Sequence, residues 1–471
     1  MPSRIAPALS GVIALAVLTR LLPVEEYGRF ALCTASMTML QAAFTQWLTL
    51  GIIRFHAAAH TEQEKSRIIA SVAALFVIEA PAVLLICVVV AFFSFDAVED
   101  RHIILLSFLY YLAFSLFTIS QRVHVSSFRS ARFSLMSVFQ SMASASFAIL
   151  FSYIIAPTAT FAIVGMILGY LCASVLDIRN TRDFLHPYAF EFKEMYRVFK
   201  FAWPTIPQSG LAALIGRIDR FILAALVGAE AVGQYNAGFS LADQAISSVF
   251  LLVALVTHPL AISAFEHKSV DAFRAQLEKN ITLMVGIALP AAVGLCAIAS
   301  ELSKIVLGES FRNSAIELIP VLVAALFISG IKDHYIAHSF HLAKKMWLPV
   351  AALVPIAAVS VLANYLLIPR FGIFGAAYVM LGAQLCALVL TYILSRWAVP
   401  FPFPVADIAK ICAAAGMMGG ILYVLPERSV WISLSTKLVL GVLCYGVALC
   451  FLNPSSIRQT IVAALKGTSV S

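Results

Sequence analysis

Long apolar stretches recur from one end of this chain to the other, and they leave little choice of fold. A bilayer core of about 30 Å is crossed by a helix of about 20 apolar residues. The chain is 61% hydrophobic and 12% charged over 471 residues, whereas soluble domains are about half apolar and about a quarter charged. We therefore predict an all-α polytopic membrane protein without a separate soluble domain.

Breaks at charged residues, Pro and Gly divide the apolar stretches into about fourteen predicted crossings. We predict two six-helix bundles, 1–185 and 186–395, and two additional C-terminal helices in 396–471. The predicted crossings are 5–22, 30–53, 68–94, 103–125, 134–156, 160–178, 201–227, 235–260, 279–307, 317–342, 347–368, 371–394, 405–425 and 430–452.

The positive charges are distributed unevenly between the predicted connections. With the first residue on the inner side, 21 of the 32 Lys and Arg fall on that side, eight fall on the other side, and three lie within crossings. Cytoplasmic loops carry an excess of Lys and Arg. We therefore predict a multi-pass protein of the cell (inner or plasma) membrane with both termini in the cytoplasm.

The net charge of +8 and the eight cysteines do not indicate nucleic acid or a metal. The basic residues occupy short loops instead of forming a basic patch interleaved with aromatic residues. The cysteines lie within apolar segments and none forms a CxxC pair. We expect them to pack as small hydrophobic side chains, without a disulfide framework or a cysteine metal site.

A short internal repeat indicates how the two halves are related. LLPVEEYGRFAL at 21–32 aligns with LVGAEAVGQYNA at 226–237, at an offset of 205 residues, with Gly28 opposite Gly233. Six predicted crossings separate the copies, so both halves should have the same orientation in the membrane. Parallel repeats of this kind build transporters from two bundles that move around a central site.

The repeat also bears on the N-terminus. MPSRIAPALSGVIALAVLTR has the charge, apolar core and A-x-A of a signal peptide, but the repeat requires this helix, so we expect it to be retained. The basic, aromatic stretch FEFKEMYRVFKFAWPTIP at 190–207 has no counterpart in the first half, because Met1 aligns with Ile206. We therefore expect either an unusually late start or a true start codon upstream of the assigned one.

Several of these motifs resemble a known family. RLLPVEEYGRFAL, the pair FAWPTIP and GRIDRFILAALVGAEAVGQYNAG, and LIPRFGIFGAAY at 367–378 are similar to the polysaccharide (O-antigen-type) flippases of the multidrug/oligosaccharidyl-lipid/polysaccharide exporter superfamily. The resemblance covers about the first 400 residues in patches. It implies a lipid-linked oligosaccharide carried from the inner to the outer leaflet through a cavity between two bundles. Membrane lipid, a polysaccharide polymerase and glycosyltransferases are the partners we expect.

Charges inside predicted crossings mark candidate sites, because they face a bundle interior or a cavity by default. Arg217 and Arg220 share one face, and Arg217 lies about 15 Å below the outer end of its crossing, near the midplane. We predict that both contact an anionic head group, since a guanidinium binds two phosphate oxygens and stays charged. Asp219 is predicted to be structural and satisfied by a neighbouring helix. The alternative is that all three charges pair with other helices and hold the bundles in register.

A second polar cluster is IKDHYIAH at 331–338. Lys332 is a further predicted head-group contact, and Asp333 is a predicted coupling or structural acid. Three histidines follow at i, i+4 and i+7 on one face, namely His334, His338 and His341. We expect a polar cavity wall and no metal, because no carboxylate or cysteine completes a ligand set on that stripe.

The first half has fewer embedded charges. Glu79 lies near the middle of the third crossing, where a carboxyl either couples transport to protons or pairs with an arginine. Arg122, near the inner end of the fourth crossing, is a predicted contact for the incoming head group or a topology signal. Asp243, in the outer third of the eighth crossing, has no assigned role.

The motifs of soluble enzymes are missing from the sequence, which has no P-loop, HExxH or GxSxG. We predict that the protein is not an enzyme and has no cofactor. We predict instead a flippase that carries a phosphate- or pyrophosphate-linked lipid oligosaccharide by alternating access, for cell-surface polysaccharide biosynthesis. A peptidoglycan-precursor lipid flippase or a cation-coupled drug exporter of the same superfamily is the main alternative. A membrane polysaccharide polymerase or glycosyltransferase would need a longer outer loop than this chain offers.

Overall fold

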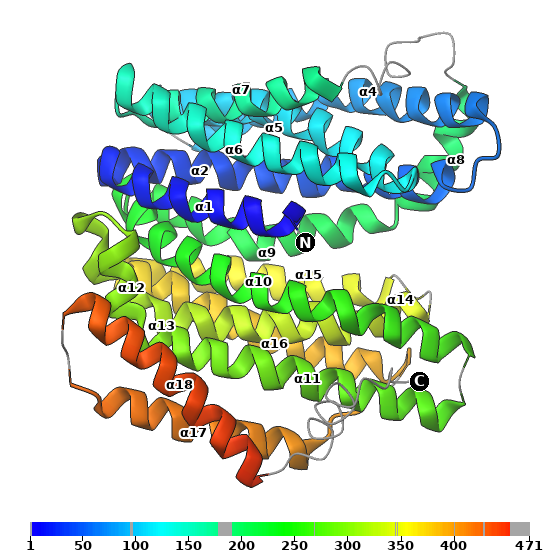
Figure 1. Ribbon diagram of the computed structural model, residues 1–471. Coiled ribbons are helices and arrows are strands. Elements are labelled where there is room, and N and C mark those ends of the chain that lie inside the picture. The colour runs from blue at the N-terminus through cyan, green and yellow to red at the C-terminus, as the bar shows by residue number, and fades with distance from the viewer. Residues whose placement is uncertain are drawn as a thin grey trace. The chain divides into compact units, whose positions relative to one another are not determined.

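The computed structural model describes residues 2–94, 98–177, 191–267, 269–343, 345, 347–399, 401–426 and 429–452. Helices make up all the regular secondary structure of these residues, and none of them forms a strand (Figure 1). Helices satisfy their own backbone hydrogen bonds, which a lipid environment requires. The predicted all-α polytopic fold is confirmed.

All fourteen predicted crossings coincide with helical segments. Among the described residues, eleven helices are long and apolar enough to span a membrane. The other three segments fall outside that criterion for different reasons. The apolar part of the first, Ala6–Leu21, is short. The second, 24–56, is interrupted by two π-helical turns. The seventh, Thr205–Leu226, carries three charges.

The described helices pack as two compact units, one of Met1–Ala237 with Leu353–Ala376 and one of Gly238–Ala352 with Ala377–Ser471. The predicted bundles 1–185 and 186–395 were derived from the sequence repeat, which packing does not test, and they stay a prediction.

The first unit contains the helices up to the start of α10, and in it α6 packs along α7, α1 along α6, and α2 along α5. Its elements are α1 (Pro2–Leu21), α2 (Val24–Leu40), η1 (Gln41–Thr45), α3 (Gln46–Gly51), η2 (Ile52–His56), α4 (Glu62–Ser94), α5 (Val98–Ser126), α6 (Ser130–Ile154), α7 (Ala159–Asp177), α8 (Phe192–Ala202) and α9 (Thr205–Leu226).

The helices from α10 onward build the second unit, except that residues 353–376 belong to the first. They are α10 (Ala229–His267), α11 (Val270–Ala297), α12 (Ala299–Val306), α13 (Glu309–Ile331), η6 (Lys332–Ile336), α14 (His338–Leu342), α15 (Trp347–Phe371), α16 (Ile373–Ser395), α17 (Val405–Val424) and α18 (Val430–Leu452).

The two C-terminal helices are fastened to the second unit by packing and by buried polar contacts. In it α17 packs on α11 and on α18, and α18 contacts α12 (Figure 1). The Lys437 ammonium lies 2.7 Å from a Glu301 carboxylate oxygen, to which the Ser433 hydroxyl also donates. An ion pair buried in protein avoids the cost of leaving either charge alone in the membrane.

The two copies of the sequence repeat contact each other inside the first unit. A Cβ atom added to Gly28 of α2 would overlap the Ala229 carbonyl oxygen, and one added to Gly233 of α10 would overlap the Val24 carbonyl oxygen. Small residues let helix backbones approach closely in membranes. The aligned glycines are therefore required by the contact between α2 and the first turns of α10.

The substitution Gly28→Ala should destabilise the protein, because the added methyl overlaps a backbone carbonyl that cannot rotate away. We expect a loss of about 1–3 kcal/mol, measured by thermal or denaturant unfolding of the purified protein. Gly416→Ala is the matched control, since a Cβ at Gly416 in α17 meets nothing within 4 Å. Equal unfolding midpoints for the two variants would show that the close approach at Gly28 does not constrain the fold.

Candidate functional site

The charges of α9 form a buried network with the start of α10. The Arg220 side chain is 0% exposed. Its Nε donates to Asn236 Oδ1 at 3.0 Å, and its Nη1 lies 3.0 Å from Asp219 Oδ1. The Tyr235 hydroxyl donates to Asp219 Oδ2 at 2.6 Å. Asp219 and Arg220 therefore bond to each other and to residues of α10.

The network is formed across the sharp turn between α9 and α10. Gly228 has a φ of 111° in the connection, a conformation that glycine adopts without strain. The turn brings Tyr235 and Asn236, both in the repeated stretch 226–237, against the last turns of α9. The ion pair of Asp219 and Arg220 on α9 is thus bonded to two side chains of α10, Tyr235 and Asn236.

The two arginines of α9 have different surroundings. Arg220 is enclosed by protein groups, so the head-group role predicted for it requires this network to open and stays a prediction. Arg217, nearly one turn earlier, is partly exposed. Of these two arginines, Arg217 is therefore the more exposed.

Lys332 and Asp333 begin the π-helical turn η6 of the second unit. The buried Lys332 ammonium donates to Gln384 Oε1 at 3.1 Å and lies 3.3 Å from Asp333 Oδ1. The Asp333 side chain is 55% exposed and accepts a hydrogen bond from Ser329. π-Helical turns occur often at functional sites, and this one places a cation beside polar partners within a membrane helix.

The histidines near η6 contact each other and backbone groups. His258 Nε2 lies 3.0 Å from the His334 carbonyl oxygen, and the rings of His258 and His338 are 3.7 Å apart. The side chain of His341 lies outside the described residues. Over the part of the chain that the structure describes, no group of three or more His, Cys, Asp or Glu side chains is placed to hold a metal ion.

Glu79 forms side-chain hydrogen bonds with Tyr111 and Trp47. The Tyr111 hydroxyl donates to Glu79 Oε1 at 3.1 Å, and Thr45 contacts both Tyr111 and Ser115 at 3.1 and 2.8 Å. Thr45 is the last residue of the π-helical turn η1. No salt bridge to Glu79 is formed within the described ranges, so the arginine partner considered from the sequence is not found there.

Sequence reasoning missed a buried cluster at the ends of α5, α6 and α7. Asp177 is fully buried and lies 2.6 Å from His124 Nε2 and 3.0 Å from Arg132 Nε, and the Ser120 hydroxyl also donates to it. Arg122, in the same turn of α5, is partly exposed. No sequence pattern linked these residues, because His124 and Arg132 are 53 and 45 residues away from Asp177.

Each unit also contains an apolar cleft of its own. The cleft of the first unit measures about 400 Å³ and lies among α2, α4, α5 and α9, with Met39, Ile86 and Phe221 in its lining. The cleft of the second unit measures about 670 Å³ and lies among α10, α11, α17 and α18, with Ile287 and Val442 in its lining. Clefts lined in this way suit apolar ligand parts such as lipid chains.

Comparison with known proteins identifies the family. Residues 17–316 match the family described as "Polysaccharide biosynthesis protein". The chain belongs to this family. The match runs from α1 into α13 and includes the network of Asp219 and Arg220. A search of curated proteins gave no match.

Solved structures with the same fold are transporters. A structure titled "Lipid II flippase MurJ, inward closed conformation" has a TM-score of 0.75 at 14% identity, and covers 95% of this chain and 97% of its own. An inward-facing multidrug resistance MATE transporter of the MOP superfamily has a TM-score of 0.65 at 13% identity, covering 86% and 95%. Identities this low show the fold alone. Together, family and fold make this chain a multi-pass membrane protein of the polysaccharide biosynthesis family with a fold shared by MurJ and MATE structures, and they confirm the resemblance seen in the sequence.

Breaking the buried network should destabilise the protein strongly. Asp219→Ala leaves the Arg220 charge enclosed without its carboxylate, which costs about 3–5 kcal/mol for a buried pair. Asp271→Ala, at an exposed position in the first turn of α11, should cost at most about 1 kcal/mol. Unfolding of the purified proteins measures both.

A double substitution distinguishes the contribution of the Asp219–Arg220 ion pair to stability from that of side-chain packing. Asp219→Ala combined with Arg220→Leu removes the stranded charge and should recover part of the lost stability. The interpretation fails if Asp219→Ala unfolds at the wild-type midpoint.

Proposed function

We propose that this protein is a transporter that carries a phosphate- or pyrophosphate-linked lipid oligosaccharide from the inner to the outer leaflet by alternating access. The product would serve cell-surface polysaccharide such as lipopolysaccharide or exopolysaccharide. The observation that carries the proposal is Arg217, a partly exposed guanidinium well inside a membrane helix of a chain that belongs to a polysaccharide biosynthesis family.

The chemistry of the head group supports this assignment. A guanidinium stays charged and offers a planar fork of donors to two phosphate oxygens. Arg220 already bonds Asp219 and Asn236, so it would hold α9 in place while Arg217 meets the phosphate. In this proposal Lys332 supplies a second cation, and Arg122 meets the head group as it arrives.

The lipid chains of the proposed substrate need apolar surroundings, unlike its head group. The two clefts are lined mainly by apolar side chains, so a lipid chain would pass from the bilayer into them without leaving apolar surroundings. Lipid chains would occupy these apolar surfaces while the sugar stays near the polar groups. Membrane lipid, a polysaccharide polymerase and glycosyltransferases are the partners that such a role implies. The setting is the inner or plasma membrane, with cytoplasmic termini.

The alternatives differ in the charge they need. A peptidoglycan-precursor flippase would also carry an anionic head group, and the MurJ-like fold agrees with it. The family match favours polysaccharide biosynthesis. A drug exporter for organic cations would need embedded carboxylates, whereas α9 presents Arg217. A polymerase or glycosyltransferase is the weakest alternative, because the matching structures are transporters.

Arg217→Ala should reduce export of surface polysaccharide in a cell that depends on this chain. A hydrogen bond to a charged group contributes about 1.5–3 kcal/mol, so we expect a loss of about tenfold or more. Arg217→Lys should give an export level between those of the wild type and Arg217→Ala, because lysine keeps the charge but lacks the planar fork of donors. Surface polysaccharide is measured relative to the amount of protein in the membrane.

Arg274→Ala is the matched control, since this side chain is 71% exposed at the start of α11, and it should leave export unchanged. Full export by both Arg217 variants at normal protein levels would exclude the head-group role.

Glu79→Gln tests whether this carboxyl couples transport to protons. The amide oxygen of Gln still accepts the hydrogen bond from Tyr111, so the unfolding temperature should stay near that of the wild type. Gln takes up no proton, so the stimulation by an imposed proton gradient should be lost in vesicles. Tyr111→Phe keeps the carboxyl and should retain that stimulation. An unchanged gradient dependence of Glu79→Gln would remove Glu79 from the mechanism.

A further inference from the structure

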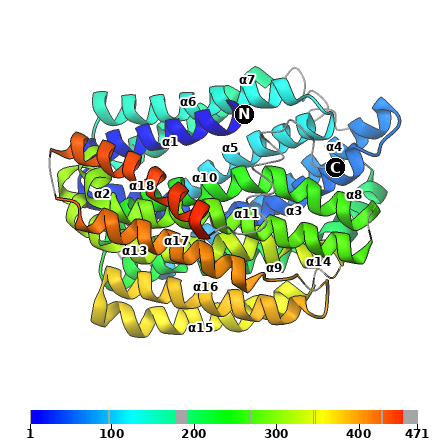
Figure 2. The ribbon, with the colours of Figure 1, turned by 60° about the horizontal axis from the view of Figure 1, so that its bottom comes forward.

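The helix α8 precedes the seventh predicted crossing, 201–227, with which it shares only its last two residues. It lies in the basic, aromatic stretch 190–207, which has no counterpart in the first half of the sequence. Figure 1 shows that α8 runs across the end of α4, transverse to the long helices of its unit, and Figure 2 shows it at the same end after rotation. Its direction is that of a helix lying along a membrane surface rather than crossing the membrane.

One face of α8 is docked on its own unit. Met195, Val198 and Ala202 are buried, and α8 packs against α3 and α4. Just before the helix, a Glu191 carboxylate oxygen lies 2.8 Å from Arg67 of α4. The placement of α8 is therefore fixed by contacts within the first unit.

A second face of α8 is a stripe of aromatic side chains. Phe192, Tyr196, Phe199 and Trp203 follow at i, i+4, i+7 and i+11, which is one side of a helix. All four are exposed, from 76% at Phe192 to 43% at Trp203. Aromatic rings with an apolar body are typical of the boundary between head groups and acyl chains. Water alone is a poor environment for such a stripe.

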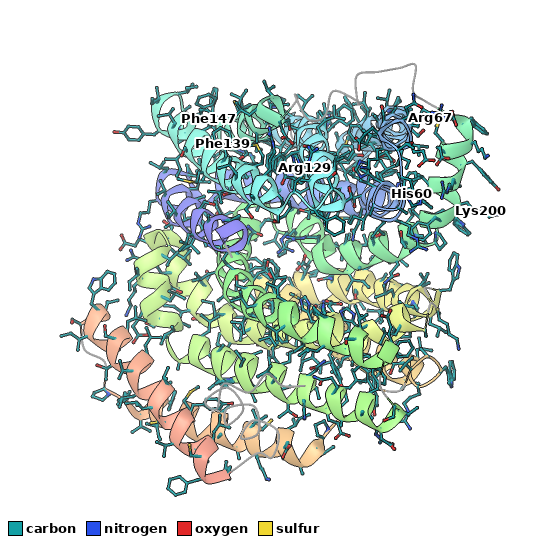
Figure 3. The ribbon with its side chains drawn as sticks, turned by 45° about the vertical axis from the view of Figure 1, so that its right-hand side comes forward. His60, Arg67, Arg129, Phe139, Phe147 and Lys200 are labelled. Atoms are coloured by element: carbon teal, nitrogen blue, oxygen red, sulfur yellow. The ribbon has the colours of Figure 1, made fainter. Side chains whose placement is uncertain are left out.

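A third face of α8 is basic, with Lys193, Arg197 and Lys200 at i, i+4 and i+7. Lys193 and Lys200 are exposed, and neither has a carboxylate within salt-bridge distance among the described residues. Arg197 is 54% exposed and lies 3.3 Å from Glu194. Figure 3 shows Lys200 at the same end of the unit as His60 and Arg67. The ammonium groups therefore face outward beside the aromatic stripe.

We propose that α8 is an interfacial helix whose basic stripe binds the head groups of anionic phospholipids in the leaflet where α4 begins. Its aromatic stripe lies at the acyl boundary, and its docked face, with Met195, Val198 and Ala202, anchors it to α3 and α4. A helix with Lys and Arg beside large apolar side chains lies in the membrane interface and attracts anionic lipid. This site is separate from the transported substrate and does not depend on the proposed function.

Quenching of Trp203 by brominated lipids tests the proposal in the full-length protein. The protein is reconstituted in phosphatidylcholine vesicles containing brominated phosphatidylglycerol or brominated phosphatidylcholine, and the Trp203 signal is isolated by subtracting Trp203→Phe. We expect phosphatidylglycerol to quench at much lower mole fraction. Lys193→Gln with Lys200→Gln should weaken this preference by about fivefold for each lysine, roughly 25-fold in all.

Two controls keep the test decisive. Lys193→Arg with Lys200→Arg keeps both charges and should keep the preference. Arg274→Gln with Lys410→Gln removes the same charge from the second unit and should leave the Trp203 signal unchanged.

An unaltered preference in the Gln double variant, or equal quenching by the two lipids in the wild type, overturns anionic-lipid binding. Quenching of Trp203 by aqueous acrylamide but not by brominated lipid places α8 in water and overturns the interfacial location. Protection from both quenchers indicates a protein partner and also overturns the proposal.

Discussion

A full positive charge enclosed in a membrane protein must have its partners fixed, and Arg220 imposes that condition on the first unit. Its guanidinium needs Asp219 on the same helix and Asn236 on the next, and Asp219 in turn needs the Tyr235 hydroxyl. These partners can meet only if α10 folds back tightly after Gly228. The same first turns of α10 pass so close to α2 that both facing positions are glycine, Gly28 and Gly233. The first turns of α10 are therefore constrained both by charge pairing with α9 and by the close backbone contact with α2.

The fold was predictable because each membrane crossing is marked by the hydrophobicity of about 20 successive residues. Each apolar stretch is long, and errors of a few residues at its ends do not change the number of helices. The site was less predictable because it depends on single side chains. Helical spacing carried no information about the flexible Arg220 side chain, which folds back to Asp219 and to the Gly216 carbonyl oxygen.

Partners contributed by other helices were invisible to spacing arguments. Asp177 and His124 are 53 residues apart and meet only after α5, α6 and α7 have packed. The Tyr111 hydroxyl that donates to Glu79 comes from α5, and it accepts from Thr45 of a π-helical turn. An extra residue within a helical turn leaves no simple sequence pattern. For the same reason α8 appeared in the sequence only as an unexplained basic and aromatic stretch. Its three faces become distinct once burial identifies the docked one.

The embedded charges differ in how they are neutralised. Arg220 has Asp219, Lys437 has Glu301, and Lys332 has Asp333 with Gln384. Each of these cations has an acidic partner within its own unit. Glu79 has the Tyr111 hydroxyl beside it instead of a cation, and a hydroxyl can donate to a carboxylate or accept from a carboxylic acid. Its surroundings accommodate both protonation states without rearranging an ion pair. A group that changes charge during a transport cycle needs such surroundings, whereas a group that only holds helices together does not.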